Sequence, residues 1–115
     1  TATTETTDGS FATSSAQGYA AANAMCDAKY PGSFFCRTYD IIATIQEEGT
    51  EGWGGTAWIA EGPPGYTSNS NDCNGWTSHN SEYFGAFWEF DSSGGGMGWL
   101  TNCGQVKPVA CCQWQ

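Results

Sequence analysis

The apolar positions divide the chain into a helical first half and a β-rich second half. Ser14 and Gln17 have the N-cap and N3 spacing of a capping box, and apolar residues recur after them at helical intervals. This pattern predicts a helix over residues 15–29. The pair Pro31-Gly32 ends it, because proline cannot donate the next hydrogen bond and glycine permits a left-handed turn.

A second helix is expected from about Thr38 to Gly49. Its apolar stripe consists of Ile41, Ile42 and Ile45, and the glycine is a common helix terminator.

The residue pattern beyond Gly49 is typical of short strands. Glycine, aromatic and β-branched residues alternate in brief runs, which turn clusters such as GPPG (62–65) and DSSGGG (91–96) separate. Helices followed by strands predict an α+β domain. The predicted strands are residues 56–61, 76–78, 83–90, 97–102 and 107–113.

Residues 1–10 form a Thr-rich arm ahead of a domain that spans residues 11–115. The arm offers almost no apolar surface to offset an ordering cost of about 10 kcal/mol or more. Main-chain pairing with a sheet edge would supply partners. We expect that edge to belong to another copy, which would give a homopolymer, and the alternative is an edge of its own domain. The assembly residues are Thr3, Thr4, Thr6 and Thr7.

Six cysteines in 115 residues indicate a disulfide framework, for which sequence alone permits 15 connectivities. Zinc is disfavoured, because the cysteine spacing lacks a C-x-x-C pair and the one histidine is His79. A disulfide framework predicts a secreted, extracellular or cell-surface protein. No apolar run approaches the roughly 20 residues that would span a bilayer, so membrane insertion is not expected.

The formal net charge of -9 argues against nucleic acid as a partner, because acidic surfaces repel phosphate backbones. Solubility explains the acidic excess better than a cation site does. Calcium needs several oxygen ligands that converge, and these carboxylates are scattered along the chain.

Several segments together resemble the C-type-lectin-like domain. They are the ending GWLTNCGQVKPVACCQ (98–113), the central AWIA (57–60) and Cys26 in the first predicted helix. DCNGWTS (72–78) and KPVACC (107–112) are similar to an exported bacterial branch described as endostatin-like. The resemblance implies two N-terminal helices on a twisted antiparallel sheet, with a long loop region and three disulfides.

By that resemblance, the expected bridges are Cys26–Cys111, Cys73–Cys103 and Cys36–Cys112. Adjacent cysteines on a strand point to opposite faces and need different partners, which agrees with this scheme.

The resemblance also bears on calcium. Members that bind sugar through calcium use a Glu-Pro-Asn-like loop and an Asn-Asp pair after a late tryptophan. This chain has Glu61-Gly62-Pro63 in the loop, and Leu100-Thr101-Asn102 follows Trp99. Because the second carboxylate is absent, we expect calcium-independent binding, with no metal and no other cofactor.

The tryptophans are candidates for stacking on sugar rings. Trp58, Trp88 and Trp99 lie in apolar strand patterns and are predicted to be core, whereas Trp53, Trp76 and Trp114 border turns and are predicted to lie at the surface. The candidate ligand-binding residues are Trp53, Tyr66, Trp76, Glu61 and Asn74.

Catalysis is not expected. His79 lies in a polar turn, and Glu89 and Asp91 form the kind of acidic pair that arises by chance. The sequence predicts a non-enzymatic extracellular module that recognises a glycan or a surface protein through loops within residues 49–82. The alternative is a structural subunit of an extracellular filament or coat.

Overall fold

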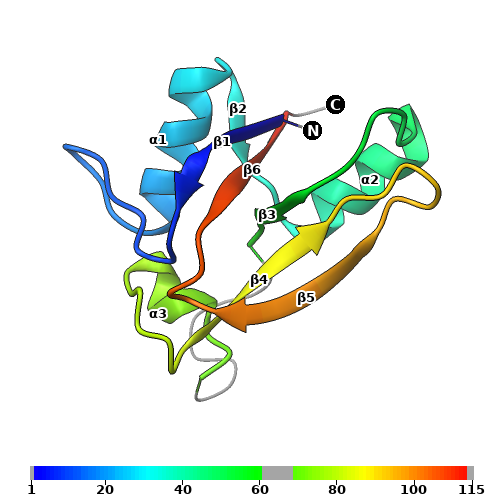
Figure 1. Ribbon diagram of the computed structural model, residues 1–115. Coiled ribbons are helices and arrows are strands. Elements are labelled where there is room, and N and C mark those ends of the chain that lie inside the picture. Colours follow the sequence, from blue (N-terminus) through cyan, green and yellow to red (C-terminus); the bar gives the residue numbers. More distant parts are fainter. Residues whose placement is uncertain (1, 61–68, 114–115) are drawn as a thin grey trace.

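The computed structural model describes residues 2–60 and 69–113, which form an α+β unit with three helices and a mixed sheet of six strands (Figure 1). The predicted α+β class is therefore confirmed. The elements are β1 (Ala2–Thr7), α1 (Tyr19–Lys29), β2 (Ser33–Phe35), α2 (Thr38–Glu48), β3 (Thr56–Trp58), α3 (Asp72–Trp76), β4 (Phe84–Glu89), β5 (Met97–Asn102) and β6 (Lys107–Gln113).

The sheet has the order β1-β6-β3-β4-β5, and β2 also pairs with β6. The expectation of a wholly antiparallel sheet is wrong, because β3 joins β6 through a parallel bridge between Trp58 and Val109. The other strand pairs are antiparallel. The last strand enters between β1 and β3 instead of adding beside β5, and a pattern of apolar residues cannot specify that order.

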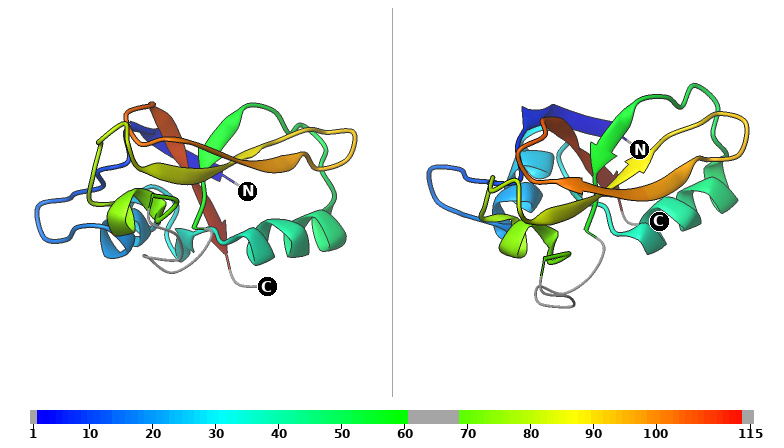
Figure 2. Two further views of the ribbon diagram at one scale, coloured as in Figure 1. Left: turned by 90° about the horizontal axis from the view of Figure 1, so that it is seen from below. Right: turned by 60° about the horizontal axis from the view of Figure 1, so that its bottom comes forward.

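Strand β6 separates two apolar cores. Val109 and Cys111 face a core that includes residues of α1, whereas Ala110 and Cys112 face a core that includes Ile41 of α2. This is the alternation expected of a strand buried on both faces. Figures 1 and 2 show α1 and α2 well apart, with the central strands between them.

The three disulfides tie these layers together. They are Cys26–Cys111, Cys36–Cys112 and Cys73–Cys103, and this is the pairing that the resemblance implied. One bridge fastens α1 to one face of β6, and another fastens the start of α2 to the opposite face.

Helix α1 begins later than predicted. The capping box at Ser14 and Gln17 is wrong, because Gln17 bridges to Ala12 in a turn before the helix. Gly18 takes the N-cap position with φ of 68°. Its missing side chain matters, since a Cβ there would lie 2.7 Å from the carbonyl oxygen of Gly75.

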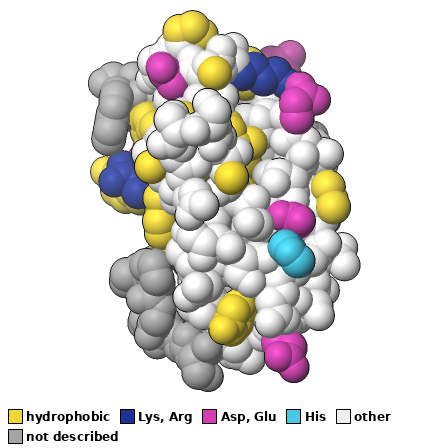
Figure 3. Space-filling model, turned by 90° about the vertical axis from the view of Figure 1, so that its left-hand side faces the viewer, with side chains coloured by type: hydrophobic (Ala, Val, Ile, Leu, Met, Phe, Trp, Pro, Cys, Tyr) yellow, Lys and Arg dark blue, Asp and Glu magenta, His cyan; other side chains and the backbone are white. Residues whose placement is uncertain are grey.

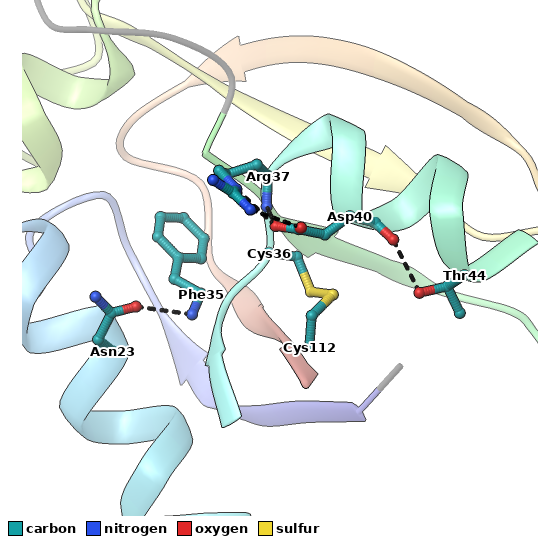
Figure 4. Close-up of polar contacts among 7 residues, drawn as sticks. All are labelled: Asn23, Phe35, Cys36, Arg37, Asp40, Thr44 and Cys112. Atoms are coloured by element: carbon teal, nitrogen blue, oxygen red, sulfur yellow. Dashed lines mark hydrogen bonds and ion pairs between the residues drawn. A yellow bond between two sulfur atoms is a disulfide. The ribbon is translucent and has the colours of Figure 1, made fainter. Parts of the chain in front are cut away.

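Helix α2 occupies the predicted span and is held at its start by Asp40 (Figure 4). The backbone N–H of Arg37 donates to Asp40 Oδ2 at 2.9 Å, and the guanidinium donates to both carboxylate oxygens at 2.8 and 2.9 Å. Partial burial alone would raise the pKa of Asp40. The hydrogen bonds and charge of Arg37 outweigh it and hold that pKa below its usual value.

Replacing Asp40 should therefore destabilise the domain in a pH-dependent way. A carboxylate whose pKa is lowered by folding stabilises the fold above its unfolded pKa of about 3.9, and the contribution disappears as pH falls through the folded pKa. We expect Asp40→Asn to cost about 1 kcal/mol at neutral pH, with the difference vanishing in strong acid. Thermal melts across that pH range measure it, with the exposed Glu47→Gln as the control. An equal loss at every pH would contradict this assignment.

Four of the five predicted strands are present, and β3 ends at Trp58, earlier than predicted. Strands β5 and β6 have their predicted bounds, and β4 is slightly shorter than predicted. The predicted strand over residues 76–78 is wrong, because Asp72, Cys73, Asn74 and Trp76 have φ between 53° and 64° and wind into the left-handed turn of α3. Residues with a Cβ rarely adopt this conformation, so no propensity rule predicts it.

The Thr-rich segment is β1, which pairs with β6 of its own chain. Thr4 is buried, and its hydroxyl accepts the backbone N–H of Val109 at 3.1 Å. The Thr3 carbonyl accepts from the Tyr30 hydroxyl, and the Thr7 carbonyl accepts from the Trp58 indole, both at 2.8 Å. The partners that offset its ordering cost thus lie within one chain, as in the alternative considered from the sequence.

Candidate functional site

Trp76 is fully buried, so its predicted place at the surface is wrong. Its ring stacks on Phe11 with centroids 4.6 Å apart and meets Trp58 edge to face. The left-handed turn directs the indole inward, and Gly85 makes room for it. A Cβ on Gly85 would lie 2.8 Å from the Trp76 ring.

The other described candidates do not come together. Trp53 is half-buried against Phe90, which follows the last residue of β4. Asn74 is exposed in α3, where its backbone N–H donates to Asn71 Oδ1 at 2.8 Å. Glu61 and Tyr66 lie outside the described residues, as does Trp114.

Trp99, predicted to be core, is instead half exposed, with 50% of its surface open. Trp58 and Trp88 are buried as predicted. The difference arises from position in the sheet, because β5 is its last strand and residues 97–100 of it are exposed. Met97, two residues before Trp99 and on the same face, is equally exposed.

Around Trp99, four strands present side chains on one face of the sheet. The Trp99 indole N–H donates to Glu89 Oε1 at 3.0 Å, across the β4–β5 pair. Phe87 lies directly opposite Trp99, and the Lys107 ammonium sits 4.1 Å from the centroid of the Phe87 ring. We call this set the sheet platform, and its members are Thr56, Phe87, Glu89, Met97, Trp99 and Lys107.

The platform combines an open indole with fixed polar groups. The Glu89 hydrogen bond orients the indole on an otherwise exposed strand, and the second Glu89 oxygen has no partner among the described residues. The Lys107 ammonium donates to the Thr56 hydroxyl at 3.3 Å. Partial burial lowers the pKa of Lys107. An acceptor, a cation and a hydroxyl therefore lie on the same sheet face as the exposed ring.

A second polar feature joins α1 to α3. The Tyr19 hydroxyl donates to Asp72 Oδ2 at 2.7 Å, and Asp72 is buried. Burial raises the pKa of Tyr19, and the hydrogen bond and charge of Asp72 raise it further. This pair anchors the left-handed turn to the first helix.

The left-hand side of the molecule in Figure 1 shows no comparable grouping. In Figure 3, hydrophobic, acidic and basic side chains are scattered over a surface made mostly of other residues and backbone. Within residues 2–60 and 69–113, no three His, Cys, Asp or Glu side chains gather as a metal site would require. The described helices include none long and apolar enough to cross a membrane.

Comparisons of this chain with family models, curated proteins and solved structures find no match.

Sequence reasoning missed the platform because it assigned Trp99 to the core. One signal was present. Phe87 and Glu89 are two residues apart in β4 and therefore point to one face of the sheet. Met97 and Trp99 have the same spacing in β5. The sequence could not show that this face lay at an open edge.

Proposed function

We propose that this chain is a non-enzymatic, extracellular binding module of C-type-lectin-like fold, which recognises a glycan through the sheet platform without calcium. The observation that carries the proposal is Trp99, a half-exposed indole held in place by Glu89. Three disulfides are typical of an oxidising compartment and support the extracellular setting.

The chemistry of the platform suits a sugar. An aromatic face complements the apolar face of a pyranose ring, and an exposed indole already fixed in one orientation loses little conformational entropy on binding. The hydroxyls around the rim of a sugar need both acceptors and donors. Glu89 supplies an acceptor, and Lys107 and Thr56 supply donors on the same face.

The groups available after Trp99 support calcium-independent binding. Asn102 Oδ1 accepts the backbone N–H of Gly104 at 3.0 Å and so serves the turn that leads out of β5. Leu100 and Thr101 carry no carboxylate. We expect a chelator to leave ligand binding unchanged.

A glycan array followed by calorimetry on the best ligand tests the proposal. We expect Trp99→Ala to weaken binding at least about tenfold, because it removes the stacking surface. Glu89→Gln should weaken binding less, since it keeps an oxygen acceptor for the indole but loses the charge. Tyr39→Ala is the matched control, because Tyr39 is an exposed aromatic residue on α2, away from the platform.

Unchanged affinity in Trp99→Ala would reject the platform as the site. An equal loss in Tyr39→Ala would place binding elsewhere, and failure of the wild-type protein to bind any glycan would reject the ligand class.

A further inference from the structure

Strand β5 forms the outer rim of the sheet (Figure 1). The hydrogen bond from Cys103 N–H to the Tyr83 carbonyl shows which opposite residues of β4 and β5 exchange backbone hydrogen bonds. Hydrogen-bonded and non-hydrogen-bonded residue pairs alternate along two antiparallel strands. The backbone groups of Trp99 therefore face β4, whereas the N–H and C=O of Gly98 and Leu100 face away from the sheet.

This rim lacks the devices that usually protect an edge strand. Edges are normally blocked by charged side chains, proline, bulges or short length. Strand β5 has six residues, and residues 92–102 contain no charged residue and no proline. The opposite edge differs, because β1 has an irregular register between Thr3 and Thr6 and carries Glu5, which pairs with Lys29 at 3.2 Å.

We propose that β5 pairs with β5 of a second copy of this chain, antiparallel and centred on Trp99, to form a two-fold symmetric dimer with a continuous sheet. In this register Gly98 and Leu100 of one copy lie opposite Leu100 and Gly98 of the other. The outward backbone groups of each copy then meet reciprocal donors and acceptors, which satisfies the self-complementarity that a two-fold interface requires.

The side chains fit the same register. Leu100, of which 53% is exposed, would lie opposite Gly98 of the second copy, where no side chain competes for space. The Trp88 ring borders that space, since its edge atoms are 3.5 Å from the position that a Cβ on Gly98 would take. On the other face, the two Trp99 residues form a non-bonded pair, in which cross-strand side chains approach most closely.

Charge permits a second copy at this edge. Each chain has a net charge of -9, so most contacts between copies would bring acidic groups together. Pairing along β5 joins uncharged segments. Glu89, the nearest acid on the platform face, lies opposite Met97, toward the end of the strand, and so stands off the two-fold axis. Added salt should strengthen the dimer by screening the remaining repulsion.

Dimerisation would place two sheet platforms side by side, but it does not depend on glycan binding. Sedimentation equilibrium over a wide protein concentration range tests it. We expect reversible dimers of the wild-type chain, and at least about tenfold weaker association for Leu100→Lys, because a buried charge would face the second copy. Leu100 is exposed on the face opposite Trp99, so this variant keeps the platform. Val106→Lys is the matched control, since Val106 is an equally exposed apolar residue outside β5.

Residue-resolved amide exchange gives a second readout that does not rely on a variant. The N–H groups of Gly98 and Leu100 should become protected as protein concentration rises, whereas that of Trp99 should be protected throughout. A wild-type chain that stays monomeric at all concentrations would overturn the proposal, as would a dimer that Leu100→Lys leaves intact. Protection of Gly98 and Leu100 only when an unrelated extended peptide is added would assign the edge to a different partner and also overturn it.

Discussion

Removing both bridges that end in β6 should unfold this domain, whereas removing either one should leave it folded. The expectation follows because the chain loop closed by one bridge overlaps almost completely with the loop closed by the other. Cys26–Cys111 and Cys36–Cys112 join points 85 and 76 residues apart, and their ends are close neighbours in the chain. Once one bridge has formed, the other closes a loop of only about eleven residues through the first bridge.

The chain-entropy model gives the sizes. Closing a loop of that length stabilises the fold by about 3 kcal/mol, whereas the first long loop contributes about 4.5 kcal/mol. Either single-bridge variant, with its two cysteines changed to alanine, should thus lose about 3 kcal/mol, and the variant without both should lose about 7 kcal/mol. Since domains are typically stable by about 5 to 15 kcal/mol, the second loss can exceed what remains.

Urea unfolding of the three variants, followed by circular dichroism, measures these losses. The variant lacking Cys73–Cys103 serves for comparison, because that bridge spans 30 residues on its own and should contribute about 3.7 kcal/mol. Losses of about 4.5 kcal/mol from each single bridge, adding without interaction, would show that the loops are independent and contradict the nested account.

The second large effect should come from one glycine in the turn between β4 and β5, directly before β5. Gly96 has φ of 97°, and a Cβ there would collide with the backbone carbonyl of Glu89. Both the left-handed conformation and the clash oppose a side chain, and the clashing atom is backbone that cannot swing aside. Gly96→Ala should therefore cost about 3 kcal/mol or more.

Gly94→Ala provides a control in the same glycine run. A Cβ on Gly94 would meet nothing within 4 Å, and no positive φ is required there. The change should be neutral or slightly stabilising, because it lowers the entropy of the unfolded chain. Thermal melts of both variants decide the question. Similar stability for Gly96→Ala and Gly94→Ala would mean that the turn between β4 and β5 does not hold Gly96 at a positive φ.

The sequence predicted those elements whose signals are local. The Ile stripe and Gly49 bound α2 correctly, and the alternation in KPVACCQ placed β6 with its two cysteines on opposite faces. Strand β2 was missed, because three residues are too few to show a period.

The misplaced tryptophans have a common cause. Trp76 and Trp99 each directly follow a glycine in the chain, and the burial of each depends on tertiary position. Trp76 enters the core because α3 turns left-handed and Gly85 leaves space, whereas Trp99 stays open because β5 is an edge. Strand order and left-handed backbone arise from long-range packing, which no local pattern encodes. The candidate site in the structure therefore lies on the sheet, whereas the sequence predicted it in the loops.

The most direct test of the sheet platform is a titration that follows the tryptophan indole N–H signals by nuclear magnetic resonance. The Trp99 signal is assigned by its loss in Trp99→Phe, and the best array glycan is then added to the wild-type chain. We predict that the Trp99 signal shifts in a saturable way while that of buried Trp58, which is bonded to the Thr7 carbonyl, stays in place. A saturable shift at other tryptophans with Trp99 unmoved would contradict a glycan site on the platform.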